Sequence, residues 1–189
     1  GTFQSTRLEV VIEGEVVDIA LVDAVVSTDA FIGSRAIWKM DKVKQVFLNR
    51  TSPACIGFSS IGGMLRSIAA QEPVSMHLII GDNGWPVTAP IAPGIIETVS
   101  VKEMQLMAAG ESADINFIPS VVALDGEREV EIRKGQQAAI RLSVHGPLVV
   151  DVERTMIFAM ERKIFAPGYG KGPGTLKNVE GKFKHTKTN

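Results

Sequence analysis

Short apolar segments separated by turn residues run along most of the chain. Leu8 to Ile12 and Val43 to Leu48 are rich in β-branched and aliphatic residues, which favours buried β-strands. Val16 to Val26 continues in this style, with two aspartates as its only charged residues. Such a run predicts either one strand buried on both faces or two strands joined by a bend. Gly14, between two glutamates, predicts a turn before this run.

The second half of the chain predicts hairpins. Val121 to Leu124 and Glu129 to Arg133 flank Asp125-Gly126, and the second strand alternates strictly between charged and apolar residues. A turn at Gly81 to Gly84 is expected to separate two further strands. The remaining strand candidates are Ile37–Lys39, Ala54–Phe58, Val74–Ile80, Trp85–Ala89, Thr98–Val101, Met104–Met107, Ala138–Val144 and Leu148–Val152.

A single short helix is expected, at Met64 to Ala70, where good helix formers occur together. Many short strands with so little helix predict an all-β fold, a β-sandwich or a barrel, over residues 1–165. From about Ala166, glycine, lysine and proline replace the aliphatic residues. Residues 166–189 are therefore expected to form a flexible basic tail, with a polyanion-binding arm as the alternative.

The overall composition narrows the class of protein. The chain has 189 residues, of which 45% are hydrophobic, and a net charge of −1, so we expect one main domain that binds no nucleic acid. No apolar run is long enough for a membrane span. The single cysteine, Cys55, is expected in the core, and a reduced thiol fits a cytoplasmic protein. His77, His145 and His185 are widely spaced and without acidic neighbours, so we expect structural histidines and no metal site.

One junction between a strand and a helix has the chemistry of a ligand cradle. Phe58 to Gly63 contains two serines and two glycines, which can leave backbone N–H groups free for a phosphate or a ribose hydroxyl. The alternative is structural, since Ser59 or Ser60 can cap the helix while the glycines form the turn. The residues by themselves do not separate these two interpretations.

Five segments follow one another in a recognisable order over residues 7–145. They are Arg7–Val11, Val17–Leu21, Ile56–Met64, Thr88–Pro93, and the hairpin Leu124–Gly126 with Ile132–Gly135. In this order they resemble the C-terminal domain of the ATP-NAD kinase family, and most closely its acetoin-catabolism X (AcoX-type) branch. In that family the corresponding segments are an opening strand, an Asn-Glu pair, Thr-Pro-Thr-Gly-Ser-Thr, Thr-Pro-Ile-Cys-Pro and a Phe-Asp-Gly hairpin.

The resemblance implies a fold, a ligand and a reaction. It implies a β-sandwich-like domain that forms much of a pocket for NAD, and transfer of the γ-phosphoryl group of ATP to the ribose 2′-hydroxyl with Mg²⁺. The catalytic aspartate would lie in an N-terminal α/β domain with a Gly-Gly-Asp-Gly segment, which this chain lacks. The chain therefore holds no predicted catalytic residue and is expected to be inactive alone. It would be an excised domain, a fragment, or one of two partner chains.

The same resemblance places the candidate ligand contacts. Asp18 would occupy the acidic position of the Asn-Glu pair and reach toward the ribose or nicotinamide. The residues that would line the ligand are Ser59, Ser60, Gly62 and Gly63. Arg66 stands where the family often has a tyrosine, and it would bind a phosphate or carboxylate unless it is simply an exposed helix arginine.

Several family positions differ in this chain. Val17 replaces the asparagine, and Ile61 and Met64 replace hydroxyl residues. These changes favour a related nucleotide or a phosphorylated metabolite beside NAD as the ligand. Two other functions remain open, namely the C-terminal half of a lipid (diacylglycerol-type) kinase and a non-catalytic ligand-sensing or interaction module. Exposed sheet edges also predict a homo-oligomer.

Overall fold

The computed structural model describes residues 1–28 and 40–168. The strand expected at Ile37–Lys39 and most of the predicted basic tail lie outside these described residues. The chain divides into two compact units, one formed by Phe3–Val149 and the other by Gly1–Thr2 with Val150–Asn189. Each unit is described by itself.

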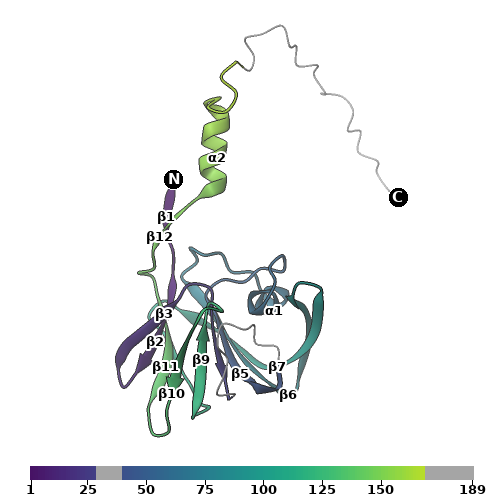
Figure 1. Cartoon of the computed structure of the whole chain (residues 1–189), viewed down its shortest axis with the longest axis vertical. Helices are drawn as coiled ribbons and strands as arrows, with labels where there is room; N and C mark the ends of the chain where they lie inside the picture. Colours follow the sequence, from purple (N-terminus) through teal and green to yellow (C-terminus); the bar gives the residue numbers. More distant parts are fainter. Residues whose placement is uncertain (29–39, 169–189) are drawn as a thin grey trace, which may run out of the picture. The chain divides into compact units, whose positions relative to one another are not determined.

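The larger unit contains a four-stranded antiparallel sheet (Figure 1). Its strands are β2 (Arg7–Ile12), β3 (Glu15–Ala20), β8 (Ser112–Asp114) and β11 (Ala138–Ser143), in the order β3-β2-β11-β8. The apolar run from residue 16 to 26 proves to be two strands joined by a bend, the second being β4 (Asp23–Ser27). The alternative of one strand buried on both faces is wrong, because Val16 and Val17 are exposed.

A six-stranded antiparallel sheet forms the second layer. It has the order β10-β9-β4-β5-β6-β7, in which β5 follows a single 3₁₀ turn. The bounds are Asp23–Ser27 for β4, Val43–Leu48 for β5, Val74–Ala92 for β6, Ile95–Ala108 for β7, Ser120–Leu124 for β9, Arg128–Ile132 for β10 and Met40–Lys42 for the 3₁₀ turn. The hairpin predicted at Asp125-Gly126 is confirmed, with Arg128 opposite Leu124.

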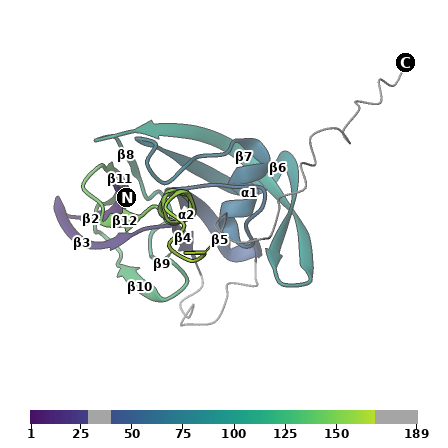
Figure 2. The same cartoon turned by 90° about the horizontal axis from the view of Figure 1, so that it is seen from above.

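Two buried clusters flank the six-stranded sheet. Between the two sheets, Leu8 and Leu142 of the smaller sheet join Phe47 and Leu124 of the larger one in one apolar cluster. On the opposite face, the apolar side chains of β5 and β6 pack around Ile61 of helix α1 (Phe58–Leu65). Figures 1 and 2 show α1 beside β6. The prediction of an all-β, sandwich-like fold with little helix is confirmed.

The β6–β7 ribbon is longer than the sequence suggests. A turn was predicted at Gly81–Gly84, but β6 continues through these residues, and its register against β7 shifts between Ile80 and Trp85. Gly84 allows this close approach, because a Cβ atom there would lie 2.3 Å from the carbonyl oxygen of Val101. A bulge therefore replaces the expected turn.

The helix predicted at Met64–Ala70 is misplaced, since α1 begins at Phe58 and ends at Leu65. The strand expected at Ala54–Phe58 is a turn followed by the first residue of that helix. Cys55 lies in the turn and is exposed, so its expected place in the core is also wrong.

The smaller unit contains a helix that the sequence analysis missed. Helix α2 (Val152–Glu161) begins where a strand was predicted to continue to Val152. The preceding strand, β12 (Leu148–Val150), pairs with β1 (Thr2–Gln4). The carboxylate of Asp151 accepts a hydrogen bond of 2.9 Å from the N–H of Arg154, and this N-cap starts the helix.

Candidate functional site

The bend between β3 and β4 is fixed by one carboxylate. Asp125, in the turn between β9 and β10, accepts hydrogen bonds from the backbone N–H groups of Leu21, Val22 and Asp23, the shortest being 2.7 Å to Val22. Its positive φ of 54° and that of the following Gly126, 71°, turn the chain so that the side chain reaches the bend. The carboxylate thereby satisfies three N–H groups that the bend leaves without a strand partner.

Asp18, a predicted ligand contact, lies at the same bend. Its carboxylate forms an ion pair with Arg128 and accepts a hydrogen bond of 2.7 Å from the N–H of Ile19. Arg128 also donates to the carbonyl oxygen of Ile19 at 2.7 Å and lies 3.8 Å from the carboxylate of Asp125. A ligand would therefore meet Asp18 as one half of an ion pair.

Asp23 differs from these two acids because its side chain has no such partner. Within residues 1–28 and 40–168, no group donates a hydrogen bond to the Asp23 carboxylate and no cation lies at ion-pair distance. Burial and the nearby Asp125 carboxylate raise the pKa of Asp23 to about 6, and exposed Arg50 opposes that rise. A half-buried carboxylate with a raised pKa is a candidate proton acceptor or hydroxyl ligand.

The serines predicted to line the ligand lie inside α1 and bond to the protein itself. Ser59 donates to the carbonyl oxygen of Arg50 at 3.1 Å. Ser60 donates to the carbonyl oxygens of Gly57 at 2.7 Å and Pro90 at 3.0 Å. Both serines are buried, and Gly57, with a φ of 96°, occupies the N-cap position without a side-chain cap. Neither serine caps the helix, so that structural alternative is also wrong.

The two predicted glycines allow α1 to approach its neighbours closely. A Cβ atom at Gly62 would lie 2.4 Å from the Cδ1 atom of Leu48, and one at Gly63 would lie 2.2 Å from the backbone carbon of Ser52. Arg66 follows the helix, and its guanidinium lies 3.6 Å from the Glu72 carboxylate with 43% of its side chain exposed. These positions explain the glycines by packing, and they leave Arg66 accessible.

The segment Asn49–Arg50 links the two groups of predicted residues. The buried Asn49 amide donates to the carbonyl oxygens of Leu21, at the bend, and Thr6 at 2.9 and 3.0 Å. The carbonyl oxygen of Arg50 accepts from Ser59, at the start of α1. We call Asp18, Asp23, Arg50, Asp125 and Arg128 the acidic bend. The serines and glycines of α1 follow Arg50 in the sequence and do not belong to the acidic bend.

Sequence reasoning found only Asp18 of the acidic bend as a site residue. Asp23 was read as a charge within a strand, and Asp125 as a turn residue. The sequence signal for these two residues was that each acid lies at a bend, one at Leu21-Val22 and the other at Asp125-Gly126. Only the pairing of β4 with β9 brings those bends together.

Buried His77 belongs to a structural network. Its ring stacks on Phe47 at 4.3 Å between centroids, and its Nε2 atom lies 3.0 Å from the Gln45 amide nitrogen. Gln45 also binds the backbone of Asp114 and Asn116, so its amide is fully used. Burial lowers the pKa of His77 to about 4, which keeps the ring neutral. The described residues contain no cluster of acids, histidines or cysteines that could hold a metal ion.

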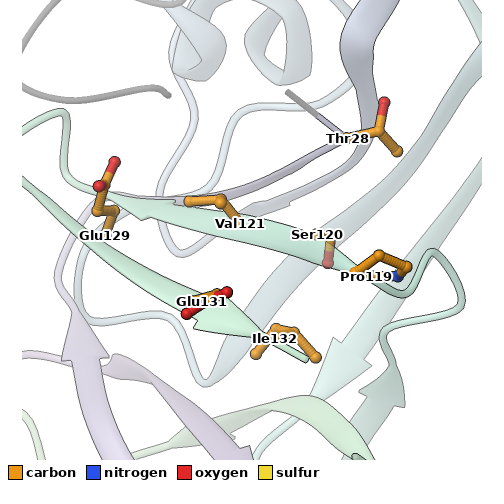
Figure 3. Close-up of a pocket in the computed structure, with 7 residues that line it drawn as sticks. All are labelled: Thr28, Pro119, Ser120, Val121, Glu129, Glu131 and Ile132. Carbon is orange, nitrogen blue, oxygen red and sulfur yellow. The ribbon is translucent and has the colours of Figure 1, made fainter. Parts of the chain in front are cut away.

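Two surface cavities lie away from the acidic bend. One has a volume of about 380 Å³, and Figure 3 shows it at the β9–β10 edge. It is lined by Thr28, Pro119, Ser120, Val121, Glu129, Glu131 and Ile132. The other, of about 500 Å³, lies at the ends of β2, β8 and β11. None of the six predicted site residues lines either cavity. Neither α1 nor α2 is long enough to span a membrane, and they are the α-helices that the described residues form.

Comparison with known proteins assigns the chain to a family. Residues 6–145 match the model of the acetoin catabolism protein X C-terminal domain. The acetoin catabolism protein X of Cupriavidus necator is 37% identical over 142 residues, which cover 74% of this chain and 40% of that protein. The chain thus spans less than half the length of this relative. The chain belongs to the acetoin catabolism protein X (AcoX) family, and residues 6–145 are its C-terminal domain.

Proposed function

We propose that this AcoX domain binds NAD, a related nucleotide or a phosphorylated metabolite. In the intact protein, ATP with Mg²⁺ would phosphorylate a hydroxyl group of that ligand. A relative named for acetoin catabolism supports a role in the same catabolism for the intact protein. The AcoX assignment and the ordered segments over residues 7–145 support the comparison with NAD kinases, and the acidic bend supports the ligand class.

The carboxylate of Asp23, which has no partner among the described residues, carries this proposal. A half-buried carboxylate gains most from a ligand that donates hydrogen bonds, and ribose or other hydroxyl groups are such donors. Exposed Arg50 lies close enough to influence the pKa of Asp23, and the Arg128 side chain is 45% exposed. Guanidinium groups bind phosphates by charge-assisted hydrogen bonds. A hydroxyl-binding acid near exposed Arg50, with Arg128 bound to the neighbouring Asp18, suits a ligand that carries both hydroxyl and phosphate groups.

The transfer step itself belongs to the rest of the intact protein. The described residues offer no metal cluster for Mg²⁺, so the ion and ATP would be held mainly by an N-terminal α/β domain with a Gly-Gly-Asp-Gly segment. This chain alone is therefore expected to bind its ligand without turnover. We further propose a cytoplasmic protein that self-associates.

Calorimetric titration of the chain tests this proposal. NAD, NADP, ATP and a panel of phosphorylated metabolites are titrated into the wild type and into Asp23→Asn and Arg50→Ala. At least one of these compounds should bind, and each substitution should weaken that binding by at least about tenfold, because each removes a charged contact. Glu131→Gln serves as the control, since it neutralises an exposed carboxylate outside the acidic bend.

Three outcomes would contradict the proposal. Absence of heat with every nucleotide and metabolite would favour a non-catalytic interaction module. Binding of diacylglycerol in place of nucleotides would favour the lipid-kinase alternative. Conversion of NAD to NADP by this chain in Mg-ATP would contradict the assignment of catalysis to a separate domain.

A further inference from the structure

Helix α2 presents a row of apolar side chains that the described residues of its unit leave exposed. Val152, Met156 and Met160 recur every fourth residue, so they lie along one side of the helix. Their exposed fractions are 66%, 51% and 67%. We call these three residues the α2 stripe. Large apolar side chains aligned in this way mark an interaction surface more often than a free one.

Neighbouring residues enlarge this apolar surface. Ile157 is 47% exposed, and Ile164 and Phe165, just after the helix, are 56% and 74% exposed. Within α2 only Ala159 is buried. Phe158 is partly covered by the guanidinium group of Arg162, which lies 4.1 Å from the ring centroid. In residues 1–28 and 40–168, no such group covers the stripe.

The first residue of the chain is attached to the start of the same helix. The amino group of Gly1 donates to the hydroxyl of Thr155 at 3.0 Å, and its carbonyl oxygen accepts from the N–H of Asp151 at 2.9 Å. Gly1 and the first turn of α2 are thus hydrogen-bonded to each other.

The family comparison supplies the length of chain that could cover the stripe. The matched region is a C-terminal domain and represents 40% of the relative from Cupriavidus necator, so most of that protein lies outside the match. The match to the domain ends at residue 145, seven residues before α2 begins at residue 152 (152 − 145 = 7). The helix thus lies outside the matched residues.

We propose that the α2 stripe is the docking surface for the N-terminal part of the intact AcoX protein. Apolar residues at this spacing fit a complementary apolar groove or helix. This inference goes beyond the ligand proposal, since it requires no particular nucleotide.

Hydrogen exchange of backbone amides, compared between the intact AcoX protein and this chain alone, tests the proposal. Amides of residues 152–161 should exchange at least about tenfold more slowly in the full-length protein than in this chain alone, because docking shields α2 from opening. Met156→Lys with Met160→Lys should abolish the difference. Glu161→Lys is the matched control, because it changes the net charge by the same +2 at a position outside the stripe. Unchanged exchange in β9 would verify that each variant folds.

Two results would overturn the proposal. Equal exchange of α2 in both proteins would mean that the N-terminal part does not cover it. Protection in this chain alone that rises with protein concentration would assign the stripe to a second copy of the chain. Because neither measurement involves a nucleotide, failure here is distinguishable from failure of the ligand proposal.

Discussion

The three aspartates of the acidic bend have different roles because their side chains have different partners. Asp125 binds three consecutive backbone N–H groups and holds the bend, whereas Asp18 forms an ion pair with Arg128. Asp23 has neither kind of partner within the described part of the chain, and its pKa is raised to about 6. The family resemblance predicted Asp18 as a site residue, but the raised pKa of Asp23 depends on its burial and on Asp125, about a hundred residues away in sequence.

Asp23→Asn should change the pH dependence of stability in a defined direction. The pKa of Asp23 is about 6 in the folded state, above the ordinary aspartate value of 3.8, so the folded state binds more protons between these values. The free energy of unfolding therefore falls as pH rises from about 4 to 6. Asp23→Asn lacks this fall in the free energy of unfolding. Between pH 4 and pH 7, its free energy of unfolding should therefore rise by about 1–2 kcal/mol relative to that of wild type.

Urea unfolding at pH 4 and pH 7 measures this difference. Asp82→Asn is the control, because Asp82 is an exposed aspartate on β6 without a partner carboxylate. If Asp23→Asn and Asp82→Asn changed stability equally at both pH values, the raised pKa of Asp23 would be refuted.

At the scale of the elements, the pattern of apolar residues predicted the strands well, but glycine, serine and other turn residues did not predict the helix bounds. β2, β5, β9 and β10 lie where the pattern placed them. The helix was misplaced because serine and glycine in Phe58–Gly63 have low helix propensity, whereas packing against β5 requires small residues there. The missed start of α2 had a local signal, since Asp151 is a typical N-cap. Tertiary contact therefore overrides local preference at α1 but not at α2.

Gly63→Ala tests whether packing explains the glycines of α1. A methyl group there would meet the backbone of Ser52, which cannot move as a side chain can. The substitution should lower the free energy of unfolding by about 2–3 kcal/mol, despite the better helix propensity of alanine. Gly168→Ala is the control, because a Cβ atom at Gly168 meets nothing within 4 Å. A neutral or stabilising effect of Gly63→Ala in thermal unfolding would leave the glycines free for a ligand role.

For the whole molecule, stability depends on buried His77 and half-buried Asp23, whose titrations have opposite effects. The pKa of His77 is about 4 in the folded state, below the ordinary histidine value of 6.5, so the unfolded state binds more protons between these values. Its contribution therefore rises with pH over the range where that of Asp23 falls. No sequence pattern reveals this balance, because burial of His77 against Phe47 and the approach of Asp23 to Asp125 are both products of strand pairing.

His77→Phe should expose this balance. The variant lacks the rise that His77 contributes, so from pH 4 to pH 7 its free energy of unfolding should fall by about 2–3 kcal/mol relative to wild type. The comparison is made across pH within one variant, so a constant loss from the missing bond to Gln45 cancels. Asp23→Asn should show the opposite slope, and the double variant should again vary little, because independent sites add. Equal slopes in wild type and His77→Phe would show that His77 does not titrate with a lowered pKa.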